Sequence, residues 1–331
     1  MIITMNKFKI MRKTRIILFS VLLALVIVSS CKKDDPINEA EVLVDYLESN
    51  ITPNPVSFLP AYIDAAGLQA ANVLDQVYII DVRSAIDYAA GHIENAVNVP
   101  VLPDIIDHVE ATDLSGYDKI AVACYTGQSA AWATALLRLL GYDNAYSLKF
   151  GMSGWHPDFD KWTTNTGNTY FASFETTANA KGTEGDYPEI STGFESGADI
   201  LDARVDAIVA EDFGAAAITA STVFANLSNY YIVNYWPEAQ YLSPGHVPGA
   251  INYIPGESFT TATNLKTLPT DKTIVVYCYT GQTSAFMAAY LRLLGYDAKS
   301  LKFGANGMIY DNMPASKWVP LTQGYDYVTS K

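Results

Sequence analysis

Two stretches of the chain decide the fold: residues 119–143, KIAVACYTGQSAAWATALLRLLGYD, and residues 273–297, TIVVYCYTGQTSAFMAAYLRLLGYD. In each, an apolar run precedes a cysteine, and a Tyr-Thr-Gly-Gln loop leads into a segment rich in Ala and Leu that stops at a glycine. The two stretches are 154 residues apart, which is the length of a whole domain. This spacing predicts a duplicated domain rather than a solenoid of short repeats.

Each copy shows the same order of predicted elements. Short apolar runs bounded by polar residues indicate buried strands, and the Ala- and Leu-rich segment indicates a helix that ends where Gly141 or Gly295 can adopt a left-handed cap. Strand–helix–strand alternation predicts an α/β fold, with a mostly parallel central sheet flanked by helices in each domain. The predicted strands are 77–80, 120–123, 145–148, 230–233, 274–277 and 298–301, and the predicted helices are 130–140 and 284–294.

Composition shifts divide the chain further. A polar, proline-containing stretch precedes the first copy and includes a short predicted helix at 42–47, and a stretch rich in Thr, Gly, Asn and Ser separates the copies. The predicted segments are a signal peptide at 1–30, a tether and linker at 31–55, a first domain at 56–162, an inter-domain linker at 163–197 and a second domain at 198–326.

The amino terminus has the layout of an export signal. Five basic residues and no acidic residue occur in residues 1–30, and an apolar run from Ile16 to Val28 is too short for a comfortable membrane span. Val28-Ser29-Ser30-Cys31 resembles a bacterial lipobox, which implies cleavage before Cys31 and lipidation of that residue. We therefore expect an exported protein, lipid-anchored in the bacterial cell envelope on the periplasmic or surface side. An uncleaved anchor helix or an ordinary signal peptide is the alternative.

Net charge limits the class of partner. The chain has a formal net charge of −14, and removal of the five basic residues of the signal changes this net charge to −19. A negative field of this size repels phosphate backbones and anionic headgroups, so nucleic acid is not an expected partner.

The cysteine loops can stabilise an anion. Successive backbone N–H groups between strand and helix, together with the partial positive charge of the helix start, favour a thiolate or a terminal persulfide on Cys124 and Cys278. Gly127 and Gly281 fit because a loop curled this tightly needs positive φ. Besides Cys31, these are the two cysteines of the chain, so they form either one disulfide or two separate thiols.

The first copy resembles the rhodanese family on four motifs: Asp81-Val82-Arg83, Asp87-Tyr88, the run from Gly91-His92 to Ala96, and the Cys124 loop. The resemblance covers nearly all of the exported chain as two modules. It implies a sulfurtransferase that needs no cofactor, in which Cys124 and Cys278 alternate between thiol and persulfide. It implies a small sulfur donor and, as acceptor, cyanide, a thiol or a partner protein's cysteine. The implied substrate-binding loop residues are Tyr125, Thr126, Gly127, Gln128 and Ser129, with Tyr279, Thr280, Gly281, Gln282 and Thr283 in the second copy.

The sequence also departs from the family pattern. Neither loop contains a cation, so thiosulfate is expected to be a poor donor. Asp81 and Arg83, which we expect to pair behind the first loop, are replaced in the second copy by Asn234 and Trp236. No arginine follows either cysteine closely enough to bind a phosphate, which disfavours phosphatase activity. The alternative function is a noncatalytic binding or redox module, or a second domain that serves only as a brace.

The remaining chemistry-bearing residues have structural interpretations. His92 and His246 follow a glycine at a turn, where a ring nitrogen satisfies backbone groups. With four histidines in the chain and no clustered Cys/His spacing, no metal site is expected. Trp132, Trp155 and Trp162 are predicted to lie in the core.

Overall fold

The structure is a computed structural model and describes residues 37–330. It contains two five-stranded sheets in which every strand pair is parallel, with the orders β1-β5-β4-β2-β3 and β6-β10-β9-β7-β8. The strands are β1 (Tyr62–Ile63), β2 (Val77–Asp81), β3 (Val97–Asn98), β4 (Lys119–Ala123), β5 (Ala145–Leu148), β6 (Ala217–Ile218), β7 (Tyr230–Asn234), β8 (Ile251–Asn252), β9 (Thr273–Tyr277) and β10 (Ala298–Leu301).

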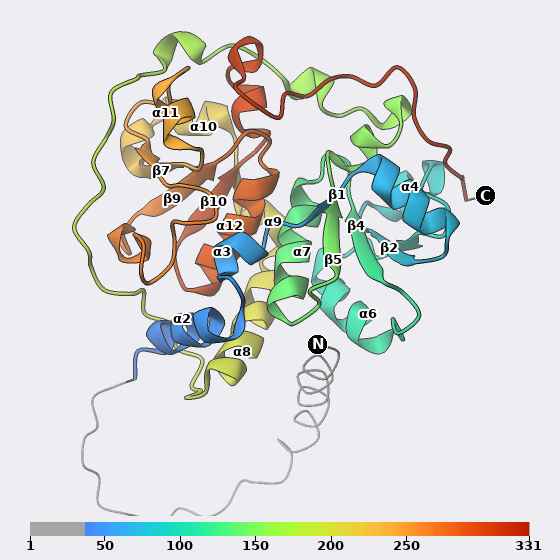
Figure 1. Cartoon of the computed structure of the whole chain (residues 1–331), viewed down its shortest axis with the longest axis horizontal. Coiled ribbons are helices and arrows are strands. Elements are labelled where there is room, and N and C mark those ends of the chain that lie inside the picture. The colour runs from blue at the N-terminus through green and yellow to red at the C-terminus, as the bar shows by residue number, and fades with distance from the viewer. Residues whose placement is uncertain (1–36, 331) are drawn as a thin grey trace, which may run out of the picture.

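Helices cover both sheets, and the α/β class predicted from the sequence is confirmed (Figure 1). The helices are α2 (Glu39–Asn50), α3 (Pro55–Phe58), α4 (Ala65–Val73), α5 (Ala85–Ala90), α6 (Ile105–Ala111), α7 (Gln128–Leu139), α8 (Gly197–Ala210), α9 (Asp212–Ala215), α10 (Ala220–Ala225), α11 (Glu238–Leu242) and α12 (Gln282–Leu293). Short 3-10 helices follow the last strand of each sheet, at η2 (Gly151–Gly154) and η8 (Gly304–Gly307).

The predicted central elements agree with the observed ones to within two residues at each end. The helices predicted to start at 130 and 284 start two residues earlier, directly after Gly127 and Gly281, which adopt φ of +80° and +77°. The caps at Gly141 and Gly295 are left-handed, with φ of +93° and +97°. The edge strands β1, β3, β6 and β8 are two residues long, too short to leave a periodic signal in the sequence.

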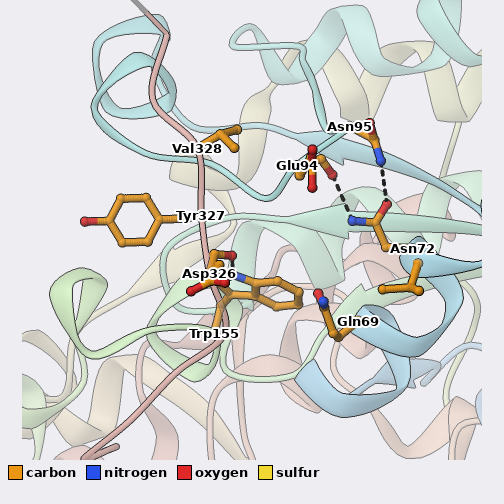
Figure 2. Close-up of a pocket in the computed structure, with 9 residues that line it drawn as sticks. Gln69, Asn72, Glu94, Asn95, Trp155, Asp326, Tyr327 and Val328 are labelled. Carbon is orange, nitrogen blue, oxygen red and sulfur yellow. Dashed lines mark hydrogen bonds between the residues drawn. The ribbon is translucent and has the colours of Figure 1, made fainter.

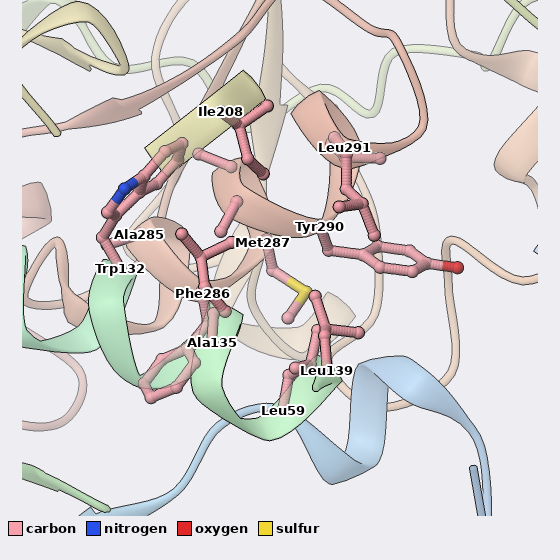
Figure 3. Packing of buried hydrophobic residues seen from close by; sticks show 14 of the residues in the cluster. Leu59, Trp132, Ala135, Leu139, Ile208, Ala285, Phe286, Met287, Tyr290 and Leu291 are labelled. Atoms are coloured by element: carbon pink, nitrogen blue, oxygen red, sulfur yellow. The ribbon is translucent and has the colours of Figure 1, made fainter. Parts of the chain in front are cut away.

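The two helices that follow the cysteine loops, α7 and α12, pack directly against each other and join the domains. One apolar cluster runs through both, with Trp132 of α7 and Phe286 and Tyr290 of α12 fully buried (Figure 3). Full burial of side chains of this size contributes roughly 1.5–3 kcal/mol each. The domain interface is therefore part of the main hydrophobic core.

Helices outside the predicted domain core complete this cluster. α2 packs against α8, and Leu43, Val44 and Leu47 of α2 are buried. The segment 31–55, predicted as a tether and linker with a helix at 42–47, thus contains a longer helix that belongs to the shared core. Cys31 and the predicted signal peptide lie outside the described residues. Within residues 37–330 no helix is both long and apolar enough to cross a bilayer.

The chain segment that follows each domain continues onto the other domain. After the first domain, Glu175 pairs antiparallel with His246, with N···O distances of 2.9 and 2.8 Å. The C-terminal segment returns to the first domain, where Val328 pairs in the same way with His92, at 2.9 Å in both directions (Figure 1). Tyr325 and Asp326, placed by the sequence-based boundary in the second domain, contact Trp155 of the first. Each domain is closed by a segment that follows the other.

Candidate functional site

The Cys124 loop lies at the carboxyl end of the central strand β4. Its Sγ accepts a hydrogen bond from the Gly127 N–H at 3.1 Å, and the residue is 5% exposed. The turn after β5 supports the loop from below, where the Met152 N–H donates to the Cys124 carbonyl at 2.7 Å. The sulfur therefore lies at the start of α7, with the backbone amide of Gly127 directed at it.

Charged residues surround the next loop residue, Tyr125. Its hydroxyl donates to Asp87 at 2.8 Å, the Arg83 guanidinium lies 4.9 Å from the ring centroid, and the Lys161 Nζ lies 5.3 Å from it. Hydrogen bonds from Ser84 and Tyr125 are the largest causes that lower the pKa of Asp87, and the charges of Arg83 and Lys161 lower it further. The first loop thus has two cations beside it, although the loop sequence itself contains none.

Asp81 and Arg83 form the ion pair expected from the sequence. Arg83 Nη2 donates to Asp81 Oδ2 at 2.6 Å and to the Gly91 carbonyl at 2.7 Å, and both side chains are nearly fully buried. Asp81 ends β2, which is paired in register with β4, so the pair lies one strand away from the cysteine. Removing one partner of such a pair would leave an uncompensated buried charge, which costs about 3–5 kcal/mol. Its contacts fit a supporting role.

The Cys278 loop has the same backbone course and different chemistry. The Cys278 Sγ accepts from the Ser284 N–H at 3.3 Å and donates to its hydroxyl at 3.7 Å, and the residue is 2% exposed. Ser284 lies in the first turn of α12, where the first domain has Ala130. This thiol is therefore hydrogen-bonded to a backbone amide and a hydroxyl in the first turn of α12, whereas the amide on Cys124 belongs to the residue before α7.

A neutral aromatic cluster replaces the ion pair beside Cys278. Trp236 occupies the position of Arg83 and stacks on Tyr279 with ring centroids 5.1 Å apart. Asn234 replaces Asp81 and donates to the Tyr277 hydroxyl at 2.8 Å. Burial, together with the nearby Cys278, raises the pKa of Tyr279 to about 12, and its hydroxyl donates to Gln240. Neutral donors and rings thus surround this thiol.

The other predicted loop residues divide into two groups. Thr126 and Thr280 accept hydrogen bonds within their own loops, from Gln128 Nε2 at 3.0 Å and from the Gln282 N–H at 3.3 Å, and Ser129 is partly exposed. Gln128, Gln282 and Thr283 contact the other domain. Their partners are the Phe303 N–H at 2.9 Å, the Phe150 N–H at 3.1 Å and the Tyr62 hydroxyl at 2.8 Å.

Cys124 and Cys278 are free in this structure, which fits two separate thiols rather than one disulfide. The histidine rings behave as expected for turn residues, with Nδ1 of His92 2.8 Å from the Tyr88 carbonyl and Nδ1 of His246 2.9 Å from the Tyr241 carbonyl. Trp132, Trp155 and Trp162 are buried. Within the described part of the chain, no three His, Cys, Asp or Glu side chains cluster in a way that could hold a metal ion.

A polar hollow of about 290 Å³ lies away from the thiols, between α4, the Glu94–Asn95 turn and the C-terminal segment at Asp326 and Tyr327 (Figure 2). Its lining residues include none from either cysteine loop. The Asn72 amide in it is already engaged, since it donates to the Glu94 carbonyl at 2.9 Å. The hollow exists because the C-terminal segment crosses the surface of the first domain beside α4, and it is not part of the cysteine sites.

Comparison with known proteins identifies the family. Residues 65–158 and 194–309 each match the family model of the rhodanese-like domain. The chain belongs to the rhodanese-like family. Its two matched regions confirm the tandem arrangement of rhodanese-like domains predicted from the repeat.

Relatives include sulfurtransferases. The chain is 37% identical over 81 residues to "Thiosulfate sulfurtransferase GlpE" of Pseudomonas fluorescens, which covers 24% of this chain and 72% of that protein. It is 28% identical over 83 residues to "Adenylyltransferase and sulfurtransferase uba4" of Ogataea parapolymorpha, covering 25% of this chain and 21% of that protein. The rhodanese-like modules are thus related to domains of sulfurtransferases.

Among solved structures, the chain is similar to a thiosulfate sulfurtransferase from Pseudomonas aeruginosa, with 17% identity, 86% of this chain and 49% of that chain covered, and a TM-score of 0.31. It is also similar to a rhodanese-related protein from Thermoplasma volcanium, with 26% identity, 29% of this chain and 89% of that chain covered, and a TM-score of 0.26.

Lys161 is the residue beside the first rhodanese-like loop that sequence reasoning missed. It lies 37 residues after Cys124, so inspection of the loop alone does not find it. The repeat offers a signal, because Lys161-Trp162 recurs as Lys317-Trp318. In the second domain, however, Lys317 lies over Tyr310, 4.2 Å from its centroid, and not over the loop tyrosine.

If Lys161 attracts anions to Cys124, Lys161→Ala will slow alkylation of Cys124 by the anionic iodoacetate more than by neutral iodoacetamide. A single exposed charge predicts a change in this ratio of about two- to threefold at low salt, which disappears near 1 M salt because of screening. Lys317→Ala is the matched control and should leave the ratio at Cys124 unchanged. An equal ratio in Lys161→Ala and the unchanged protein would rule out this role.

Proposed function

We propose that this protein is a sulfurtransferase that moves a sulfane sulfur from a small donor to a thiol or cyanide through a persulfide on Cys124. The observation that supports it most strongly is the amide of Gly127, which donates to Cys124 Sγ at the start of α7. The same oriented amide and helix start that stabilise a thiolate can stabilise the terminal sulfur of a persulfide.

The proposed reaction has two displacements. The Cys124 thiolate attacks the sulfane sulfur, an S–S bond forms on Cys124, and the donor leaves with the electron pair of the broken bond, as sulfite if the donor is thiosulfate. An acceptor thiolate or cyanide then attacks the outer sulfur, and Cys124 leaves as a thiolate. The product is a persulfide or thiocyanate, and no external oxidant or reductant is needed.

The surroundings of the two thiols favour Cys124 over Cys278 as the thiol that reacts with the sulfur donor. Arg83 beside the first loop is neutralised by its pair with Asp81, and Lys161 lies 5.3 Å from the Tyr125 ring centroid, where its charge can attract an anionic donor. In the second domain Trp236 takes the place of Arg83 and stacks on Tyr279, and Lys317, the counterpart of Lys161, lies over Tyr310. The Cys278 thiol is also slightly more buried. The expectation that thiosulfate is a poor donor applies most strongly to the second domain, since its loop has neither cation.

A noncatalytic role is the second candidate, and the second domain supplies the observation that favours it. Its thiol is hydrogen-bonded to Ser284, and Tyr62 of the first domain covers the loop through a hydrogen bond to Thr283 at 2.8 Å. Burial, and secondarily Cys278, raises the pKa of Tyr62. A module of this kind would bind or brace rather than exchange sulfur.

The experiment is the intact mass of the protein after incubation with thiosulfate or a polysulfide, for the unchanged chain, Cys124→Ser and Cys278→Ser. The proposal predicts a gain of one sulfur that cyanide and reductant remove, that Cys124→Ser abolishes and that Cys278→Ser retains. No gain with either donor, from protein with titratable free thiols, would leave the noncatalytic module as the better account.

We also propose that the protein is exported and anchored by a lipid on Cys31, so that both domains act at the cell envelope. The lipobox-like Val28-Ser29-Ser30-Cys31 supports this, and the acidic net charge is compatible with function away from nucleic acids. Metabolic labelling with a radioactive fatty acid should mark the protein and should fail with Cys31→Ser. Equal labelling of both forms, or none of the unchanged protein, would contradict lipid anchoring at Cys31.

A further inference from the structure

The two loop glutamines are the most buried polar side chains of the loops. Gln128 is 2% exposed and Gln282 is 1% exposed. Each is the first residue of its helix, and α7 and α12 pack against each other. The glutamines therefore lie where the two cysteine loops meet, and not at a surface where a substrate arrives.

Each glutamine bonds to the other domain in a reciprocal arrangement. Gln282 Oε1 accepts from the Phe150 N–H at 3.1 Å, and its Nε2 donates to the Leu148 carbonyl at 3.5 Å. Gln128 Oε1 accepts from the Phe303 N–H at 2.9 Å. Phe150 and Phe303 follow the strands β5 and β10 and occupy equivalent positions in the two domains.

The turn that Gln282 holds is the support of the Cys124 loop. Phe150 has φ of +62°, a backbone conformation that is costly for a phenylalanine and persists where its surroundings fix it. Gly151 follows, so close to the loop that an added Cβ would lie 2.3 Å from the Cys124 carbonyl oxygen and 2.6 Å from the Gly127 nitrogen. Displacement of this turn would displace the loop.

Gln282 also touches the loop itself. A Cβ added to Gly127 would lie 2.0 Å from Gln282 Nε2. Gly127 is the residue whose amide donates to Cys124 Sγ. The glutamine of the second domain thus contacts both the loop glycine that holds the sulfur and the turn beneath it.

We propose that Gln282 is a positioning residue for the Cys124 thiol of the other domain. It fixes the Gly127 amide and the Phe150 turn so that the hydrogen bond to the thiolate is already formed before a donor arrives. The inference deepens the proposed function and rests on Cys124 as the reacting thiol. It is tested by alkylation, which needs no sulfur transfer, so a failure of persulfide formation and a failure of this inference give different results.

The reciprocal contact is weaker for Cys278. Gln128 Oε1 lies against Gly281, at 2.5 Å from an added Cβ, but the amide that donates to Cys278 Sγ belongs to Ser284 in α12. Gln128 therefore holds the Phe303 turn beneath the second loop, and it does not contact Ser284, whose amide donates to Cys278 Sγ. The structure therefore assigns the larger effect to Gln282.

The experiment measures alkylation of Cys124 by iodoacetamide against pH on the full chain, with each cysteine peptide read by mass spectrometry. Gln282→Met keeps the volume and removes both hydrogen bonds. We expect the midpoint of the Cys124 alkylation profile to move to higher pH, with about tenfold slower alkylation near neutral pH, because the thiolate would lose a positioned hydrogen bond. Gln128→Met should move the midpoint at Cys124 less, and Gln323→Met, on the exposed C-terminal segment, should not move it.

An unchanged midpoint in Gln282→Met, or an equal or larger shift at Cys124 in Gln128→Met, would overturn the inference. Hydrogen exchange separates local release from unfolding, because the peptide containing Phe150 should lose protection while β4 keeps it. If Gln282→Met does not fold, Gln282→Asn is the variant that tests the inference. Asn keeps the amide group, but its side chain is one methylene shorter and does not reach the same partners. It should also raise the midpoint, and an unchanged midpoint there would contradict the proposal.

Discussion

The structure depends on the packing of α7 against α12. Both helices begin directly after a cysteine loop, so their contact brings the two loops together and removes the loop glutamines from solvent. The same apolar cluster extends into α2 and α8, which makes the domain interface continuous with the core. Apolar area removed from water is the main stabilising term in folding, so this interface cannot open without a large cost. The site is therefore built on two domains held in one fixed relation.

Two loops with almost the same sequence acquire different chemistry from the strand beside them. In the first domain β2 ends in Asp81 and is followed by Arg83, and the charges extend through Tyr125 to Lys161. In the second domain β7 ends in Asn234, and Trp236 takes the place of the guanidinium against Tyr279. Charge beside a thiol changes which donors approach it, whereas stacked rings exclude water. Duplication has thus produced one site with charged groups beside it and one with neutral groups on the same backbone.

Sequence was sufficient for those features that depend on local chemistry. The strands before each cysteine, the positive-φ glycines and the left-handed helix ends follow from apolar runs and from glycine's freedom, and the Asp81–Arg83 pair was expected from its motif. The repeat itself predicted two domains, which the family match confirms.

Features that arise from contacts between distant segments could not be predicted in this way. Nothing in the Tyr-Thr-Gly-Gln sequence indicates that the glutamine side chain accepts a hydrogen bond from the backbone of the other domain, at Phe303 or Phe150. The pairing of Val328 with His92 joins residues 236 positions apart, and the long helix α2 was expected to be mostly linker. Lys161 reaches Tyr125 only because the chain returns beneath the loop after β5. Each of these requires the three-dimensional arrangement of the domains.

The two domains form one structural unit, with a shared core and exchanged closing segments. Scanning calorimetry of the full chain tests it most directly. We expect a single unfolding transition whose calorimetric and van't Hoff enthalpies agree, because neither domain keeps its core when the other unfolds. Two separable transitions, with a calorimetric enthalpy well above the van't Hoff value, would show that the domains unfold independently and do not share one core.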